Sequence, residues 1–374
     1  MGAGYLFVQI RRIYLHDRLF SISFLLAVGS SFIAVPKIEY IDWRVIACLF
    51  NISIILLALD ELQVLERVSV NILQRCHDQR RLSFILVALT FVSSMFITND
   101  MALLTFVPIT LIIARKAGFD PGFTVILQAL GANIGSSLTP LGNPQNLFLY
   151  NYYQLSLQQF LMIMLPFVVL GGAWLCLLNR RTRNRKLEFE LETIALVSRR
   201  KTILYLGLFA VIFLSVLRLI DYRLVTVMVL MAVLIMDRHL FKRVDYCLLG
   251  TFVCFFIVVG NLSQLSWLSS FFSQACLSSS GSFVGSIILS QFISNVPSAI
   301  FLAHFTQQWE AILLGVNVGG LGTLIASMAS VIAYRLYTRE FKNPSYLKRF
   351  LFYNVISLLI LSIAMYWLTT SSLA

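Results

Sequence analysis

The sequence predicts an all-α polytopic membrane protein made of two inverted repeats, each with a re-entrant helical hairpin and a discontinuous transmembrane helix. Three observations support this fold class. Of the 374 residues, 59% are hydrophobic and only 12% are charged, whereas a soluble domain has roughly 25% charged residues. Apolar runs recur along the chain at lengths near that of a membrane crossing. Two polar motifs each occur twice, in the same order.

Composition also narrows the class of function. The net charge is +12, but the basic residues lie between apolar runs, so membrane topology explains them better than nucleic-acid binding. We therefore expect no nucleic-acid partner. The six cysteines have neither the spacing of a metal site nor that of a disulfide framework. No metalloprotease, catalytic-triad or nucleotide-binding motif occurs, so we expect a protein that is not an enzyme.

Two kinds of apolar region are expected. Crossing segments, two of them broken, are predicted at 19–36, 43–59, 123–150 (broken), 160–178, 202–217, 224–236, 246–262, 311–334 (broken) and 350–368. Two other regions are interrupted by polar residues, with arms at 82–97 and 101–114, and at 283–293 and 299–306. A crossing takes about 20 helical residues. The second pair of arms is too short and the first is marginal, so both regions are predicted to enter and leave on one side.

The distribution of basic residues tests this topology. With a cytoplasmic N-terminus and hairpins that return to their own side, the loop 67–81 and the segments 180–201 and 335–349 all face inward. All but four of the 29 Lys and Arg residues are then cytoplasmic, as the positive-inside rule requires. We therefore expect a multi-pass inner (plasma) membrane protein with its C-terminus outside. The four exceptions are Lys37, Arg44, Arg218 and Arg223.

The two halves resemble each other. FITND at 96–100 matches FISNV at 292–296, and GANIGSSLT at 131–139 matches GVNVGGLGT at 315–323 with the same internal spacing. In the predicted topology the hairpins enter from opposite sides, which gives the inverted repeats typical of secondary transporters. The alternative is chance recurrence of short motifs. The predicted units are a cytoplasmic N-terminus (1–18), a first repeat (19–178), a basic cytoplasmic linker (179–201) and a second repeat (202–374).

The segment 139–146 is expected to unwind the first broken helix, because it contains two prolines and a glycine. Non-helical backbone at membrane depth must be buried in protein or line a polar cavity. Its carbonyls can coordinate a cation, and half-helix N-termini can face an anion. The alternative is a simple proline kink. The counterpart, 323–330, lacks proline, and its break is predicted from symmetry; Gly319 in the same helix can instead serve close packing.

The hairpin tips supply hydroxyl and amide groups near the bilayer centre, and an amide can serve both an anion and a cation. Asp100 is the one acidic residue placed far from a membrane surface, where a carboxylate is functional by default; the alternative is a helix N-cap. The expected substrate contacts are Asn99, Asp100, Asn143, Asn146, Ser294, Asn295 and Ser327. The expected coupling-ion contacts are Thr98, Asn99, Asp100, Asn133, Thr139, Gly142, Asn295, Asn317, Gly319 and Thr323, with Thr98, Asn99 and Asn133 as candidate Na⁺ ligands.

Through FITND, GANIGSSLTPLGNPQN, SNVPS and GVNVGGLGT the chain resembles the ion transporter superfamily. That group includes arsenite permeases, NhaD-type sodium/proton antiporters, citrate transporters and divalent anion:sodium symporters. The resemblance implies a homodimer in which a transport domain moves against a scaffold by an elevator motion. In the symporters a Ser-Asn-Thr triplet at each tip binds Na⁺ and carboxylate. Carried over, Thr98 and Ser294 take the Ser position and Asn99 and Asn295 the Asn position. Asp100 and Val296 take the places of the two threonines. The resulting pair Asn99-Asp100 is more similar to the arsenite-permease branch.

The sequence thus predicts a secondary active transporter for a small anion, either a carboxylate or an inorganic oxyanion, coupled to Na⁺ or H⁺ by alternating access. An arsenite/antimonite exporter and a sodium/proton antiporter of the same architecture are the alternatives, and a channel is less favoured. The expected partners are the anion, the coupling cation, the lipid bilayer and a second copy of the chain. No cofactor is expected beyond the coupling ion.

Overall fold

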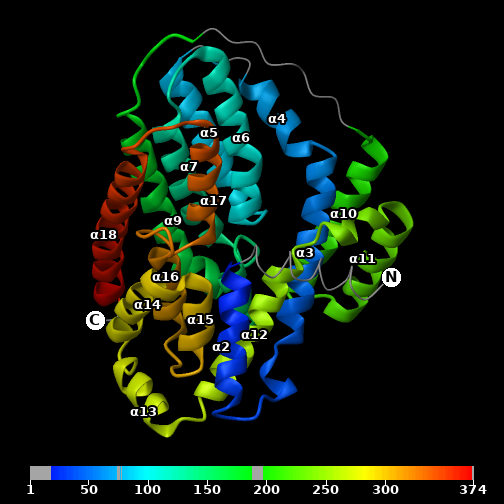
Figure 1. Cartoon of the computed structure of the whole chain (residues 1–374), viewed down its shortest axis with the longest axis vertical. Helices are drawn as coiled ribbons and strands as arrows, with labels where there is room; N and C mark the ends of the chain where they lie inside the picture. Colours follow the sequence, from blue (N-terminus) through cyan, green and yellow to red (C-terminus); the bar gives the residue numbers. More distant parts are fainter. Residues whose placement is uncertain (1–17, 74–75, 77, 188–196, 373–374) are drawn as a thin grey trace.

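A computed structural model describes residues 18–73, 76, 78–187 and 197–372 of the chain. The regular secondary structure of this part is helical, apart from one isolated antiparallel bridge between Asp78 and Lys186 (Figure 1). The prediction of an all-α fold is therefore confirmed. Residues 1–17 of the predicted N-terminal unit and residues 188–196 of the predicted linker lie outside the described residues.

Within the described residues, three helices are long and apolar enough to cross a membrane on their own: Trp43–Glu61, Leu157–Asn179 and Tyr346–Leu368. A fourth candidate is the pair Tyr246–Leu262 and Ser266–Ala275, which is bent by 101°. The other apolar helices are shorter. They are consistent with a fold in which several helices stop part of the way through the membrane.

The N-terminal helices are α2 (Arg18–Ser31), α3 (Trp43–Glu61) and α4 (Val64–Leu73). The side chain of Asp42 caps α3 by accepting a hydrogen bond from the Val45 N–H (3.1 Å). The expectation of a plain loop at 67–81 is wrong, because α4 occupies much of it. Helix α4 has no long apolar run that would indicate a crossing segment, because it mixes apolar with charged side chains at helical spacing.

The first hairpin consists of α5 (Gln79–Ser94) and α6 (Asn99–Ala117). Thr98 has extended backbone and caps α6, so the chain leaves the helix only between the two arms. The broken helix that follows is α7 (Gly122–Gly135), the short η2 (Ser136–Leu138) and α8 (Pro144–Tyr152), before α9 (Leu157–Asn179). The predicted break at 139–146 ends earlier than expected, since Pro144 occupies the first turn of α8, where its missing N–H costs nothing.

The middle of the chain forms α10 (Arg199–Val216), α11 (Tyr222–Met236), η3 (Arg238–Lys242), α12 (Tyr246–Leu262) and α13 (Ser266–Ala275). Asp245 caps α12 by accepting from the Leu248 N–H (3.0 Å). This cap is the counterpart of Asp42 on α3. Helix α12 packs against α2, and α10 packs against α3.

The second hairpin consists of α14 (Ser279–Ile293) and α15 (Asn295–Ala303). The second broken helix is α16 (Trp309–Gly319) and α17 (Met328–Glu340), followed by α18 (Tyr346–Ser372). Its break, at residues 320–327, starts and ends before the predicted 323–330. In Figure 1, α5 and α6 lie in the upper half of the molecule, and α14 and α15 lie in the lower half.

The first arm of each hairpin packs against the first part of its own broken helix at glycines of the repeated motif. A Cβ added to Gly135 would lie 2.1 Å from the Phe91 carbonyl oxygen, and one added to Gly319 would lie 3.1 Å from the Ile287 Cα. The second arm packs on the other half: α6 contacts α17, and α15 contacts α8. Because of this exchange, the two hairpins and two broken helices interlock.

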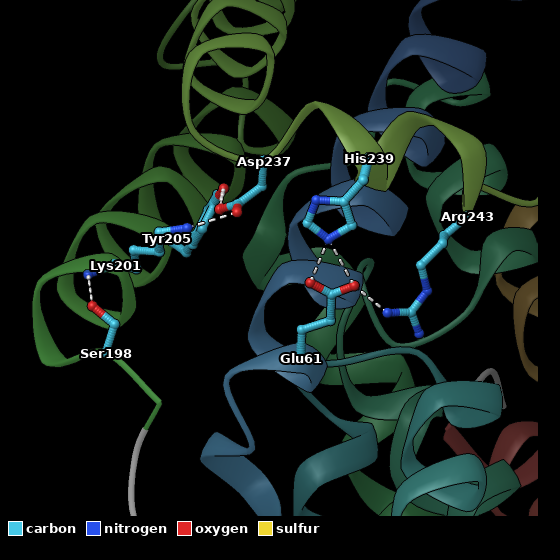
Figure 2. Close-up of polar contacts among 7 residues, drawn as sticks. All are labelled: Glu61, Ser198, Lys201, Tyr205, Asp237, His239 and Arg243. Carbon is cyan, nitrogen blue, oxygen red and sulfur yellow. Dashed lines mark hydrogen bonds and ion pairs between the residues drawn. The ribbon is translucent and has the colours of Figure 1, made fainter.

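At one end of the fold, polar contacts join α3 to η3 and α10 to the end of α11 (Figure 2). Glu61 pairs with His239 (2.8 Å) and with Arg243. Asp237, at the end of α11, accepts hydrogen bonds from Lys201 Nζ (2.6 Å) and the Tyr205 hydroxyl (2.7 Å). Burial opposes ionisation of Asp237, but these two donors outweigh it and lower the pKa of its carboxyl group.

Candidate functional site

Each hairpin tip is tied to a broken helix by the same backbone hydrogen bond. The Asn99 N–H donates to the Gly142 carbonyl (3.0 Å), and the Asn295 N–H donates to the Ala326 carbonyl (3.0 Å). Gly142 and Ala326 each stand three residues after the last threonine of the repeated motif. The unwound carbonyls of the two breaks thus satisfy the free N–H groups that open α6 and α15.

Threonines of the repeated motif make a second matched contact. The Thr139 hydroxyl donates to the Met95 carbonyl, and the Thr323 hydroxyl donates to the Gln291 carbonyl (3.2 Å). In the second half, the Gln291 side chain adds bonds to the Gly319 carbonyl (2.7 Å) and the Thr323 N–H (3.0 Å). These contacts hold each unwound segment against the end of the first hairpin arm.

The two tips differ in backbone conformation. Thr98 has φ −66° and ψ 150°, which is ordinary extended backbone. Ser294 has φ 75° and ψ 157°, a region adopted almost only by glycine and costing roughly 1–3 kcal/mol for other residues. The Ser294 hydroxyl donates to the Ala326 carbonyl (3.3 Å). The second tip is therefore strained, because a serine occupies a backbone conformation that suits glycine.

Asn133 of the first half reaches groups of the second half. Its side-chain oxygen accepts from the Ser327 hydroxyl (2.9 Å) and from the Asn99 amide (3.3 Å). Its amide nitrogen donates to the Ser330 hydroxyl (3.3 Å). Asn133 thereby connects the first hairpin tip to the second break.

Asn317 makes the reciprocal contacts. Its side-chain oxygen accepts from the Ser137 hydroxyl (2.9 Å) and the Asn143 amide (3.1 Å), and its amide nitrogen donates to the Asn146 side-chain oxygen (2.7 Å). Asn146 also donates to carbonyls of its own break, among them Thr139 (3.3 Å). Each half therefore places one helical asparagine into the unwound segment of the other half.

A small cavity of about 40 Å³ lies where both tips, the start of α8 and the second break meet. Side chains from four separate segments and from α12 surround it. The lining residues are Asn99, Asp100, Pro144, Gln145, Leu248, Thr251, Phe252, Phe255, Ser294, Asn295, Val296, Ser327 and Met328. Amides, hydroxyls and a carboxylate thus face one small space walled on one side by apolar groups of α12.

Asp100 brings an uncompensated carboxylate oxygen to this cavity. Its Oδ1 is buried and accepts no hydrogen bond within the described residues. A buried anionic oxygen without a partner is costly, and a bound cation or a proton would relieve that cost. The side chain that caps α6 is that of Thr98, so the alternative role of Asp100 as the N-cap is not what the structure shows.

The predicted site residues fall into three groups in the structure. Asn99, Asp100, Ser294, Asn295 and Ser327 line the cavity. Four asparagines do not line it but form the hydrogen bonds between the two halves: Asn133 bonds to Ser327, and Asn317 bonds to Asn143 and Asn146. The remaining residues, Thr98, Thr139, Gly142, Gly319 and Thr323, make the capping and backbone contacts of the tips and breaks.

Sequence reasoning missed Gln145, Gln291 and the wall provided by α12. Gln291 is a polar residue in an apolar hairpin arm, a signal that could have been used. The sequence of α12 is apolar along most of its length, and its pattern does not mark Thr251 or Phe252 as residues of a site. Among the described residues, no three His, Cys, Asp or Glu side chains are grouped so that they could hold a metal ion.

Comparisons with known proteins address the family. A family model described as citrate transporter matches residues 17–310. An uncharacterised transporter of Methanocaldococcus jannaschii is 33% identical over 300 residues, covering 79% of this chain and 81% of that protein. The inner membrane protein YbiR of Escherichia coli is 31% identical over 337 residues, covering 86% and 88%.

A solved structure shows the fold. The YdaH transporter of Alcanivorax borkumensis, described as having an unusual topology, superimposes with a TM-score of 0.53 over 88% of this chain and 85% of its own, at 12% identity. The family model covers most of the sequence, and the Methanocaldococcus jannaschii transporter aligns with this chain over most of its own length. The chain therefore belongs to the citrate transporter family of membrane transporters.

Proposed function

We propose that this transporter carries a small anion, a carboxylate or an inorganic oxyanion, by secondary active transport coupled to Na⁺ or H⁺. The observation that carries the proposal is the cavity on which both hairpin tips converge. It offers the amides of Asn99 and Asn295 and the hydroxyls of Ser294 and Ser327, which are donors suited to anionic oxygens. The description of the family as citrate transporters supports a carboxylate.

The coupling cation is proposed to bind at Asp100. Asp100 lines the same space and its Oδ1 has no hydrogen-bond partner within the described residues; a carboxylate beside a bound anion is tolerable only when it is protonated or paired with a cation. Loading of the cation and of the anion would therefore favour each other. This mutual dependence is what coupling requires.

The proposed mechanism is alternating access of elevator type by a homodimer, with the two repeats inverted in an inner membrane. The arrangement in Figure 1, with one hairpin in each half of the molecule, supports the inversion. The interlocked hairpins and broken helices would move as one body, because α6 packs on α17 and α15 on α8. Helices α3, α10 and α11, which pack together and carry the polar contacts drawn in Figure 2, would belong to the scaffold.

Proteoliposome uptake tests the proposal. Succinate, citrate, sulfate, arsenite and Na⁺ are offered under imposed Na⁺ or pH gradients, to the wild type, to Asp100→Asn and to Glu310→Gln. Glu310 is an exposed acid outside the cavity, so its variant is the control for lost charge. We expect gradient-driven uptake of an anion by the wild type and Glu310→Gln, and loss of the gradient dependence in Asp100→Asn. Unchanged coupling in Asp100→Asn would disprove the role of this carboxylate.

A sodium/proton antiporter is the second candidate, because Asp100 replaces the threonine of the symporter pattern and leaves a carboxylate in the site. An arsenite/antimonite exporter shares that Asn-Asp pair. The same panel separates the three: an antiporter exchanges Na⁺ for H⁺ with no anion present, and an exporter moves arsenite in preference to the carboxylates.

A further inference from the structure

A second, larger cavity lies at one end of the fold, away from the residues of the candidate site. It has a volume of about 480 Å³ and is bounded by the first turns of α5 and α7, the segment after α9, and α18. Four arginines and one aspartate line it: Arg181, Arg183, Arg185, Arg349 and Asp120. With these side chains ionised, the lining carries three net positive charges.

The single acid in the lining is already engaged. One oxygen of Asp120 accepts from the Gly122 N–H (2.8 Å) and the Tyr337 hydroxyl (2.7 Å), and the other accepts from the Asn343 amide (3.2 Å). Within the described residues, no ion pair joins a carboxylate to any of the four arginines. Like charges gathered around one space repel one another, so an anion bound among them would be stabilising.

The arginine-bearing segment is held in place by backbone contacts. The Gln79 N–H donates to the Arg185 carbonyl (2.8 Å), and Arg80 Nε donates to the Thr182 carbonyl (2.9 Å). The Asn179 amide donates in turn to the Arg80 carbonyl (3.2 Å). Such positioning lowers the conformational cost of bringing several guanidinium groups to one ligand.

We propose that this cavity binds a phosphate group. Guanidinium groups form bidentate hydrogen bonds with phosphate oxygens, and a phosphate offers more acceptors than a carboxylate does. Phe123 and Tyr353 supply apolar wall, which suits the ester portion of a larger molecule. In the predicted orientation the cavity opens on the cytoplasmic side, where basic pockets between helices bind anionic phospholipid headgroups. The proposal does not depend on the identity of the transported substrate.

Binding to the purified full-length protein in nonionic detergent tests the proposal. The probes are dioctanoyl phosphatidylglycerol, inorganic phosphate and, as zwitterionic reference, dioctanoyl phosphatidylcholine. The variants are Arg181→Gln/Arg183→Gln and the charge-retaining Arg181→Lys/Arg183→Lys. The control is Arg199→Gln/Arg200→Gln, which removes the same charge from exposed residues of α10 that do not line the cavity. A monodisperse size-exclusion profile verifies that each variant is folded.

We expect the dissociation constant for phosphatidylglycerol to rise at least about tenfold in the first variant, because one charge-assisted hydrogen bond is worth that much. The lysine variant should fall between it and the wild type, and the control should match the wild type. Displacement of the lipid by inorganic phosphate would identify free phosphate as a ligand, and its absence would identify a lipid headgroup. Equal weakening in the control, or no binding by either anionic probe, would overturn the proposal.

Discussion

The substitution Gly142→Ala tests how tightly the first break is packed. A Cβ at this position would lie 2.0 Å from the Ser136 carbonyl oxygen and 2.7 Å from its carbonyl carbon. These are backbone atoms, so the loop must open by more than about 1 Å to restore ordinary contact, and overpacking of this kind costs roughly 1–3 kcal/mol. Opening also breaks the bond from the Asn99 N–H to the Gly142 carbonyl (3.0 Å), worth about 1 kcal/mol.

The expected destabilisation by Gly142→Ala is therefore roughly 2–4 kcal/mol. The matched control is Gly285→Ala in α14, where an added Cβ meets no atom within 4 Å and where alanine favours the helix by about 1 kcal/mol. Thermal unfolding in detergent at one scan rate should give Gly142→Ala a melting temperature several degrees below the wild type, and Gly285→Ala one at or above it. Equal melting temperatures for the two variants would refute the packing argument.

Three further substitutions test the tips, the cross-half contacts and the scaffold. Ser294→Gly should raise the melting temperature, because it relieves a strain of roughly 1–3 kcal/mol, while lowering uptake; a lower melting temperature would contradict the strained tip. Asn317→Leu removes the three hydrogen bonds that join Asn317 to Ser137, Asn143 and Asn146 and should cost roughly 3 kcal/mol, whereas Asn151→Leu removes only a bond within α8 (2.9 Å); similar melting temperatures would contradict this. The pKa of Asp237 is lowered in the folded protein from its ordinary value of 3.8. Its ionised carboxylate therefore stabilises the folded state fully above pH 3.8, and this stabilisation is lost as the pH falls through the lower pKa of the folded state. The gap in melting temperature between wild type and Asp237→Asn should thus shrink below about pH 4, and a gap that widens on acidification would contradict the assignment.

The composition and the repeated motifs were sufficient to predict most of the fold and part of the candidate site. Composition and apolar runs were sufficient for an all-helical membrane fold. The prolines and glycine of residues 139–146 indicated the first broken helix, and the matched spacing around Asn133 and Asn317 extended the prediction to the second. The spacing could not show that each asparagine binds the other half, because that depends on how the halves interlock. The cavity wall on α12 was not predicted, because Thr251 and Phe252 come to line the cavity only through the packing of α12 against the hairpin tips.

Helix ends and surface helices were harder to predict. Helix α8 starts at Pro144, within the segment expected to be unwound, because proline suits the first helical turn. The second break lacks proline, so it was predicted from symmetry, and its position was misplaced by three residues; the structure holds it through the Asn295 and Gln291 contacts. Helix α4 has no long apolar run, so the pattern that indicates crossing segments does not predict it.

The proposed topology requires the two hairpins to enter the membrane from opposite sides. Single cysteines placed at the two ends of each hairpin, in a background without the six native cysteines, test it by labelling with an impermeant thiol reagent in intact cells and in inside-out vesicles. The positions are Arg81 and Lys116 for the first hairpin and Leu277 and Gln307 for the second, all exposed. We expect the first pair to react only from the cytoplasmic side and the second pair only from outside. If the two ends of one hairpin reacted from different sides, the hairpin would cross the membrane and the proposed re-entrant topology would be wrong.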